Sequence, residues 1–403
     1  MSLLVDETPE DGQLRQSLES SGNYKILRRI ELKTTTREAC EALRPPGAFP
    51  LIQALMVDCE ATGTDATVDK LLSFSALPVW YDRDTSTVVG AGECRTWFND
   101  PLEPISEKIT ELTGITDEMV SGQALDVPAI TAMIRDSAIC IAHHAGYDRT
   151  LASRYIPECA SGHWACSVDE VRWKERGYRR SSLIDLMADN GFFYNAHRSD
   201  VDCMALAVLL SEGEHAPLSE LLGNARGKTC TLHIGCDYLK DRLPHIHERN
   251  FLWDAKRKQW HKTFPADDVM SEISGFLSAA ASGVTKAHVN NASIVVKTSK
   301  TRYINDGEDR GSVLPKETVS GMFADAGFIG RGGRARDADV GEPAPATASQ
   351  AQSSQRRSGH LFIPNAGRST GGAPEGQTSM PLQEPARASP LPMRPRSLFR
   401  SEP

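Results

Sequence analysis

Carboxylates occur at three places where an apolar segment ends, and their spacing could support metal-dependent chemistry. Asp58 and Glu60 follow one apolar run, and Asp148 follows another. Residues two apart in a strand point to the same face, so Asp58 and Glu60 should project together from a strand end. Asp202 lies at the start of an expected helix. Open α/β sheets usually place their ligand sites at strand ends, so the four side chains are candidates for a common site.

Four carboxylates gathered at one site would repel one another unless cations held them. Mg²⁺ and Mn²⁺ prefer such hard oxygen ligands. Two of these ions, roughly 4 Å apart, can hold both oxygens of an in-line phosphoryl displacement. His197 precedes Asp202 on the expected loop, and a histidine near neutrality could deprotonate the attacking water. Each motif alone is more often a solvated strand end or a helix cap, so the prediction depends on the combination.

Apolar periodicity predicts the elements that must position these side chains. Strands are expected over 51–57, 71–80, 87–97 and 138–142, and helices over 106–112, 127–135, 147–155, 182–190 and 199–211. Three strands in succession, followed by alternation of helix and strand, predict an α/β fold with a mixed sheet flanked by helices. A small α+β module is predicted over 228–305, with strands at 230–234 and 292–297, a hairpin around Trp253 and Trp260, and helices at 236–242 and 267–280.

Composition divides the 403 residues into parts with different charge. The stretch 331–403 contains ten Arg, no Lys and six acidic residues, a local charge of +4 in a chain of net charge −8. With only two aromatic residues, it has too little apolar surface to offset its ordering entropy. We therefore expect a disordered tail over 306–403, a disordered arm over 1–21, an N-terminal extension over 22–50 and a catalytic domain over 51–212.

Other features concern location and partners. No apolar run approaches the length of a membrane span, and the first residues do not read as a signal peptide. The nine scattered cysteines indicate reduced thiols, so we expect a cytoplasmic protein that does not contact a membrane. Net acidity argues mildly against a nucleic-acid partner. Against this, segment 172–180 interleaves basic and aromatic residues, as phosphate- and base-binding surfaces do; the equally weighted alternative is a solvated loop with one buried Trp.

The order and context of the three motifs resemble the DnaQ-like 3′-5′ exonucleases of the DEDDh type, the superfamily of the epsilon subunit of bacterial DNA polymerase III. Segments 104–119, 164–167 and 191–203 support the resemblance, which covers 50–211 most strongly. It implies a ribonuclease H-like fold. It also implies metal ligands at Asp58, Glu60, Asp148 and Asp202, a general base at His197, and substrate contacts at Ala61, Thr62, Gly63, Ile115 and His144.

Two positions depart from the family pattern, which usually has Asn where this chain has His144 and Thr where it has Ala61. These changes should alter substrate contacts and leave the metal site intact. The resemblance implies release of nucleoside 5′-monophosphates from single-stranded DNA 3′ ends with two Mg²⁺ or Mn²⁺ ions, in proofreading or repair. An RNA exonuclease on the same fold is one alternative. A non-enzymatic adaptor that binds a sliding clamp or a polymerase is another.

The tail contains one short segment that resembles the motif by which bacterial replication and repair proteins bind the sliding clamp. Gln377 leads this motif, and Met380 and Leu382 would be its apolar anchors. A tethered motif of this kind can bind a groove weakly and raise the local concentration of its partner. The alternative is a chance match in a biased sequence. The sequence therefore indicates a sliding clamp and a DNA polymerase as candidate partners.

Overall fold

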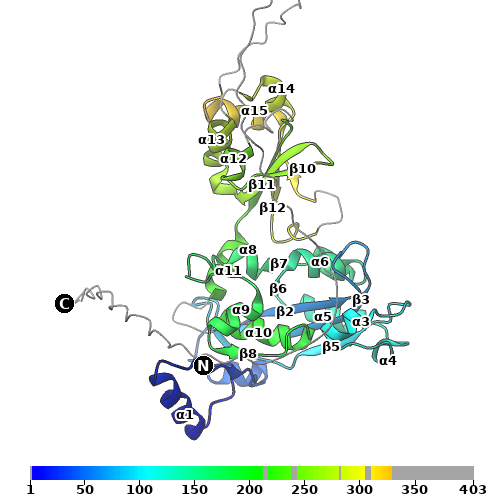
Figure 1. Cartoon of the computed structure of the whole chain (residues 1–403), viewed down its shortest axis with the longest axis vertical. Helices are drawn as coiled ribbons and strands as arrows, with labels where there is room; N and C mark the ends of the chain where they lie inside the picture. Colours follow the sequence, from blue (N-terminus) through cyan, green and yellow to red (C-terminus); the bar gives the residue numbers. More distant parts are fainter. Residues whose placement is uncertain (1, 212–216, 237–242, 281–282, 305–309, 329–403) are drawn as a thin grey trace, which may run out of the picture. The chain divides into compact units, whose positions relative to one another are not determined.

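The computed structural model describes residues 2–211, 217–236, 243–280, 283–304 and 310–328 (Figure 1). The predicted clamp-binding residues Gln377, Met380 and Leu382 lie outside the described residues. All nine cysteines are described, and none is in a disulfide. In the described part of the chain, no helix combines the length and the apolar character needed to cross a bilayer.

A six-stranded mixed sheet forms the centre of the larger domain. Its order is β4-β3-β2-β6-β7, with β5 also paired to β3. Strand β2 is antiparallel to β3 and parallel to β6, so the predicted mixed sheet is confirmed. The single strand predicted over 87–97 is divided into β4 and β5 because residues 92–94 leave the ladder. The strands are β2 (Ile52–Ala61), β3 (Leu71–Tyr81), β4 (Val88–Ala91), β5 (Arg95–Phe98), β6 (Ile139–Ala142) and β7 (Trp164–Cys166).

Strand β2 is covered on both faces, as expected of an apolar run at the centre of an α/β sheet. Ala54 and Met56 pack in one hydrophobic cluster with helix α10, whereas Leu55 and Val57 pack in another with α5 and α6. The flanking helices are α2 (Arg37–Ala42), α3 (Glu107–Thr113), α4 (Asp117–Val120), α5 (Val127–Arg135), α6 (Ala145–Ser153), α7 (Pro157–Ser161), α8 (Ser167–Glu170), α9 (Leu183–Asp189), α10 (Ser199–Ser211) and α11 (Pro217–Arg226).

The N-terminal residues differ from the disordered arm predicted over 1–21. Helix α1 (Pro9–Ser20) begins at Thr8, whose hydroxyl accepts the Asp11 N–H, and Pro9 stands where its missing N–H costs nothing. Leu3 and Leu4 are buried in the main core. Two apolar side chains and a local cap therefore order a segment whose composition predicts an arm. The adjacent β1 (Arg28–Arg29) pairs in parallel with β8 (Phe192–Phe193).

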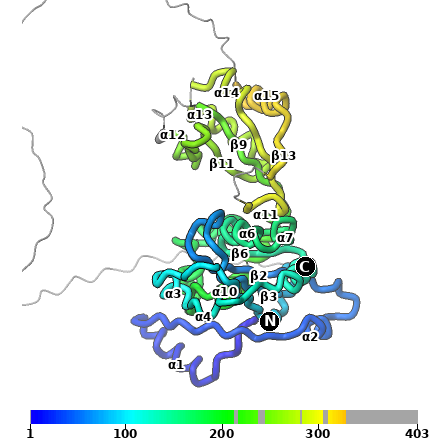
Figure 2. Tube along the Cα trace, turned by 90° about the vertical axis from the view of Figure 1, so that its right-hand side faces the viewer, coloured from blue at the N-terminus to red at the C-terminus, as the bar shows by residue number. Residues whose placement is uncertain are grey.

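The region after α11 forms a second sheet with its own core, as predicted for the α+β module. All four strand pairings are antiparallel, in the order β10-β11-β9-β12-β13. Its strands and the nearby helices α13 to α15 are traced in Figure 2. The elements are β9 (Thr229–Ile234), α12 (Leu243–His247), β10 (Leu252–Asp254), β11 (Gln259–Pro265), the 3-10 helix η2 (Ala266–Asp268), α13 (Val269–Ala280), α14 (Lys286–Asn290), β12 (Ser293–Lys297), β13 (Ser312–Val313) and α15 (Lys316–Asp325).

The ordered part of the chain extends further than the predicted start of the tail at residue 306. The composition predicts disorder from 306, but β13 pairs with β12, and α15 contributes Val319 and Phe323 to the core of the second sheet. These two side chains lie four residues apart on one helix face. The short apolar stripe is hidden in the sequence by the polar residues around it. The ordered module therefore continues past residue 320.

Segment 298–304 follows β12 and is hydrogen-bonded to residues of the larger domain. Arg149 is fully buried, and its guanidinium donates to backbone carbonyls, including those of Ser299, Lys300 and Arg302. Arg302 in turn forms an ion pair with Glu170, and both side chains are about 5% exposed. This segment is therefore part of the packing of the larger domain, although it follows the module in sequence.

Candidate active site

A cleft of about 770 Å³ opens where β2 and β6 end, and it is lined also by α3, α9 and α10. Asp58, Glu60, Asp148, Asp202 and His197 all line it. The structure therefore brings together the five residues that the sequence predicted as catalytic or metal-binding.

Three of the carboxylates form a compact cluster. Each of Asp58, Glu60 and Asp202 has an oxygen within 4.8 Å of the others. The alternation of β2 explains the first two, because positions 54, 56, 58 and 60 share the face that α10 covers. Asp202 is in the first turn of α10. This oxygen-only donor set suits a hard divalent cation.

Two buried serines opposite the strand carboxylates fix the start of α10. Ser75 pairs in register with Asp58, and Ser73 with Glu60. Both hydroxyls are hydrogen-bonded to that of Ser199, at 2.7 and 3.0 Å. Ser199 is the first residue of α10, so these bonds set the position of Asp202 relative to β2.

Asp202 is oriented through both of its oxygens. The Tyr194 hydroxyl donates to Oδ1 at 3.1 Å, and the Arg198 backbone N–H donates to Oδ2 at 2.9 Å. A carboxylate that is held in this way keeps lone pairs available on each oxygen for a cation.

Asp148 approaches the cluster from the opposite side of β2. It is 3% exposed, lies in the first turn of α6, and its Oδ1 accepts the Cys59 backbone N–H at 3.0 Å. It is not among the three residues whose oxygens meet within 4.8 Å.

The electrostatics of the four carboxyl groups fit a cation site. Burial raises the pKa of Asp58 well above its usual value, and the charges of Asp148, Asp202 and Glu60 raise it further. Burial likewise raises the pKa values of Glu60, Asp148 and Asp202. A bound divalent cation would favour the ionised forms and offset this repulsion.

His197 is exposed at the cleft, two residues before the first residue of α10, with a backbone φ of +62°. The left-handed region is uncommon for residues other than glycine, and histidine is one of the types that adopt it more readily. This conformation places the imidazole on the loop ahead of Asp202. His144 is also exposed at the cleft and precedes α6.

The other predicted substrate contacts divide into two groups. Ala61 and Gly63 line the cleft, and the Tyr147 hydroxyl donates to the Gly63 carbonyl at 2.7 Å. Thr62 and Ile115 are not among the described residues that line it. The Thr62 hydroxyl accepts the Lys70 N–H, and Ile115 is 4% exposed in a small apolar cluster. Their side chains are therefore placed in a turn and in a core.

The sequence patterns do not reveal several positioning residues, among them Tyr194, Ser73, Ser75 and His143. A signal existed for the serines, since two hydroxyls two residues apart interrupt an otherwise apolar strand. His143 is 7% exposed, and burial lowers its pKa to about 4. The ring lies 2.7 Å from both the Ser167 hydroxyl and the Ser181 carbonyl. These bonds require a fold and cannot be read from spacing.

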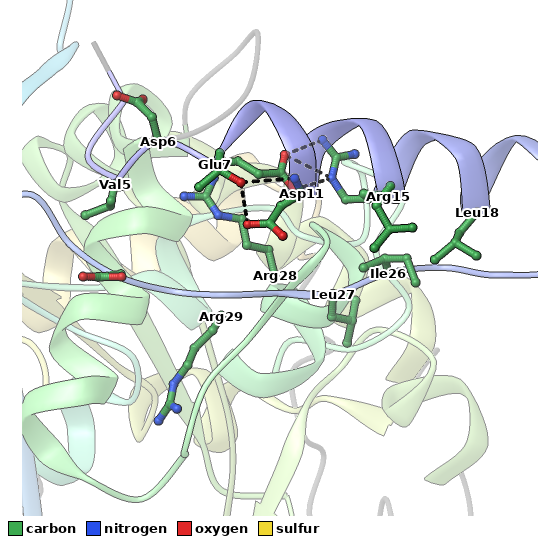
Figure 3. A pocket seen from close by; sticks show the side chains of 13 residues that line it. Val5, Asp6, Glu7, Asp11, Arg15, Leu18, Ile26, Leu27, Arg28 and Arg29 are labelled. Atoms are coloured by element: carbon green, nitrogen blue, oxygen red, sulfur yellow. Dashed lines mark hydrogen bonds and ion pairs between the residues drawn. The ribbon is translucent and has the colours of Figure 1, made fainter.

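A second hollow, of about 470 Å³, lies between α1 and segment 26–31 (Figure 3). Arg15, one of the charged residues that line it, binds Glu7 at 2.9 Å and Glu19 at 3.2 Å. It contains none of the predicted site residues. The chemistry is therefore assigned to the cleft at the end of β2.

Comparison with known proteins identifies the domain that contains this cleft. The RNase_T exonuclease family model matches residues 55–210. The PolC-type DNA polymerase III of Halalkalibacterium halodurans is 32% identical over 108 residues, which are 25% of this chain and 7% of that protein. The Bacillus subtilis PolC-type enzyme is 32% identical over 100 residues, 23% of this chain and 6% of the relative. The chain thus spans less than a tenth of the length of either relative.

Similar solved structures include exonuclease X in complex with 5′-overhanging duplex DNA, at 18% identity and a TM-score of 0.31, covering 42% of this chain and 98% of that one. Another is the zinc-bound E. coli ExoI–ssDNA complex, at 18% identity and a TM-score of 0.32, covering 46% and 48% of the two chains. A 3′-exonuclease that recognises a histone mRNA stem-loop is 14% identical, with a TM-score of 0.32, and the match covers 39% and 79%. On the family match and the motif set, residues 55–210 form a DnaQ-like exonuclease domain of the RNase_T family.

Proposed function

We propose that this protein is a 3′-5′ exonuclease that releases nucleoside 5′-monophosphates from single-stranded DNA ends, in proofreading or repair. The observation that carries the proposal is the carboxylate cluster of Asp58, Glu60 and Asp202 at the head of the cleft, with oxygens within 4.8 Å. The exonuclease family of this domain supports it. None of the nine cysteines is in a disulfide, which is in keeping with a cytoplasmic setting.

Asp58, Glu60, Asp148 and Asp202 would hold two Mg²⁺ or Mn²⁺ ions. When bound, such ions supply Lewis-acid stabilisation of the charge that develops on the phosphate oxygens. His197 would take the proton of the attacking water, for which its exposed position at the cleft is suitable. Ala61, Gly63 and His144 would contact the terminal nucleotide. Thr62 and Ile115 remain weaker candidates for such contacts, because neither lines the cleft.

The direct test uses single strands labelled at one end. A 5′-labelled strand should yield a ladder that shortens from the 3′ end, whereas a 3′-labelled strand should yield labelled mononucleotide at once. Excess chelator should stop both reactions, and added Mg²⁺ or Mn²⁺ should restore them. Release of mononucleotide from the 5′ end would contradict the proposed polarity.

The same assay addresses the alternatives. Matched RNA strands measure the sugar preference, which the carboxylate set does not encode. Complete absence of hydrolysis with either metal would favour the alternative that the protein is a non-enzymatic adaptor. A sliding clamp and a DNA polymerase remain the proposed partners, through Gln377, Met380 and Leu382. Equal clamp capture by the wild type and by the variant with all three changed to Ala would contradict that docking site.

A further inference from the structure

The basic and aromatic segment 172–180 has its aromatic side chains turned inward. Trp173 is 4% exposed, and its ring meets that of Tyr178 edge-on, with centroids 5.5 Å apart. Trp173 Nε1 donates to the Ser167 carbonyl at 2.7 Å. Trp173 belongs to the hydrophobic core, and Tyr178 packs partly buried against it. The Trp173 ring is therefore not available to stack on bases. What the segment presents to solvent is its charge.

The positive charges of this segment are used unequally. Arg172 and Arg176 both bind Glu220, at 3.0 and 2.7 Å. Among the residues that the structure describes, Arg180 contacts only Asp185, at a long 3.4 Å, and its side chain is 76% exposed. Arg179 is exposed, and within the described part of the chain it forms no ion pair. Two neighbouring guanidinium groups are therefore available to an anion at one end of the segment.

That end of the segment adjoins the cleft. Ser182 and Ile184 line the cleft. The Ser181 carbonyl accepts a hydrogen bond from Nε2 of the buried His143 at 2.7 Å, which fixes this stretch against the cleft wall. Successive Cα atoms are 3.8 Å apart, so the Arg180 backbone lies within about 8 Å of Ser182.

Charge complementarity identifies the ligand. The head of the cleft is a cluster of carboxylates, which by itself repels a polyanion. We propose that Arg179 and Arg180 bind backbone phosphates of the substrate strand where it leaves the cleft, upstream of the terminal nucleotide. Guanidinium groups suit phosphate oxygens, and Ile184, which is 52% exposed, offers an apolar surface beside them. The inference rests on the proposed function, because the ligand is the strand being shortened.

The experiment compares the wild type with Arg179→Gln/Arg180→Gln on a 20-nucleotide strand and on the p-nitrophenyl ester of thymidine 5′-monophosphate. The KM for the strand should rise about tenfold, because two exposed charge contacts are lost. The salt dependence of strand binding, log Kd against log salt, should become shallower by about 1.4, or roughly 0.7 per phosphate contact. The KM for the ester, which has no upstream phosphate, should change less than twofold.

The matched control is Arg172→Gln/Lys174→Gln, which removes the same charge from the other end of the segment. It should leave the salt slope of strand binding close to that of the wild type. Equal slopes for all three proteins, or equal losses in both double variants, would overturn the inference. Failure of the wild type to hydrolyse either substrate would instead overturn the proposed function, so the two failures are distinguishable.

Discussion

At the scale of single residues, the chemistry depends on where His197 stands. Its left-handed backbone at φ +62° limits the replacements that leave the loop intact. Asn tolerates this region but cannot act as a base near neutral pH. His197→Asn should therefore reduce kcat by about 10² to 10⁴, the usual contribution of a general base.

Measurement of the pH–rate profile separates this role from a structural one. A general base makes the rate fall at acidic pH, and this fall should disappear from the profile of His197→Asn. His144→Asn, at the other exposed histidine of the cleft, serves as a control and should retain this fall. An unchanged profile in His197→Asn would remove the base assignment.

The buried His143 affects the stability of the protein and makes it depend on pH. Burial lowers its pKa from 6.5 to about 4, so the unfolded chain binds a proton before the folded protein does. The stabilisation is therefore fully present above pH 6.5 and is lost as the pH falls toward 4. Between pH 7.5 and 5 the loss of stability from this one group should be about 2 kcal/mol.

Urea unfolding at pH 7.5 and pH 5 measures this effect. His143→Gln should be less stable than the wild type at pH 7.5 but should lose less stability on acidification. His245→Gln, on the exposed surface of α12, is the matched control and should follow the wild type. A full acid-dependent loss in His143→Gln would show that another group is responsible.

At the scale of elements, the ion pair of Arg302 and Glu170 joins segment 298–304 to α8. Removing one partner leaves a buried charge alone, so Arg302→Ala should lower the free energy of unfolding by about 3–5 kcal/mol. The paired change Glu170→Met/Arg302→Met replaces both charges with apolar groups and should recover most of that loss. Equal destabilisation by both variants would mean that packing, and not the unpaired charge, sets the cost.

Elements with a regular apolar pattern could be predicted from the sequence, and those set by local contacts could not. The apolar run of β2 and the apolar pattern of α10 predicted the sheet and the helix that covers it, and therefore the place of Asp58, Glu60 and Asp202. Helix α1 depends on a cap and on Leu3 and Leu4, which carry no periodic signal. Contacts such as Ser199 with Ser75 join residues that are more than 120 positions apart, so only the fold reveals them.

At the scale of the whole molecule, the net charge of −8 averages over parts with opposite roles. Part of the acidity is the carboxylate cluster, whose charge bound cations would offset. Arg179 and Arg180 place positive charge beside the same cleft. Overall acidity therefore does not argue against a polyanionic substrate, because a strand would meet local charge and not the average.

The proposed activity of the molecule requires that the cluster of Asp58, Glu60 and Asp202 serves catalysis and not the stability of the fold. The most direct measurement compares metal-dependent release of mononucleotide by the wild type, Asp58→Asn and Asp202→Asn, with thermal unfolding of each protein without metal. We predict that both variants lose activity by at least about 10³-fold. They should unfold at an equal or higher temperature, because each removes a buried like charge. Wild-type-like turnover by either variant would show that the cluster is not the catalytic site.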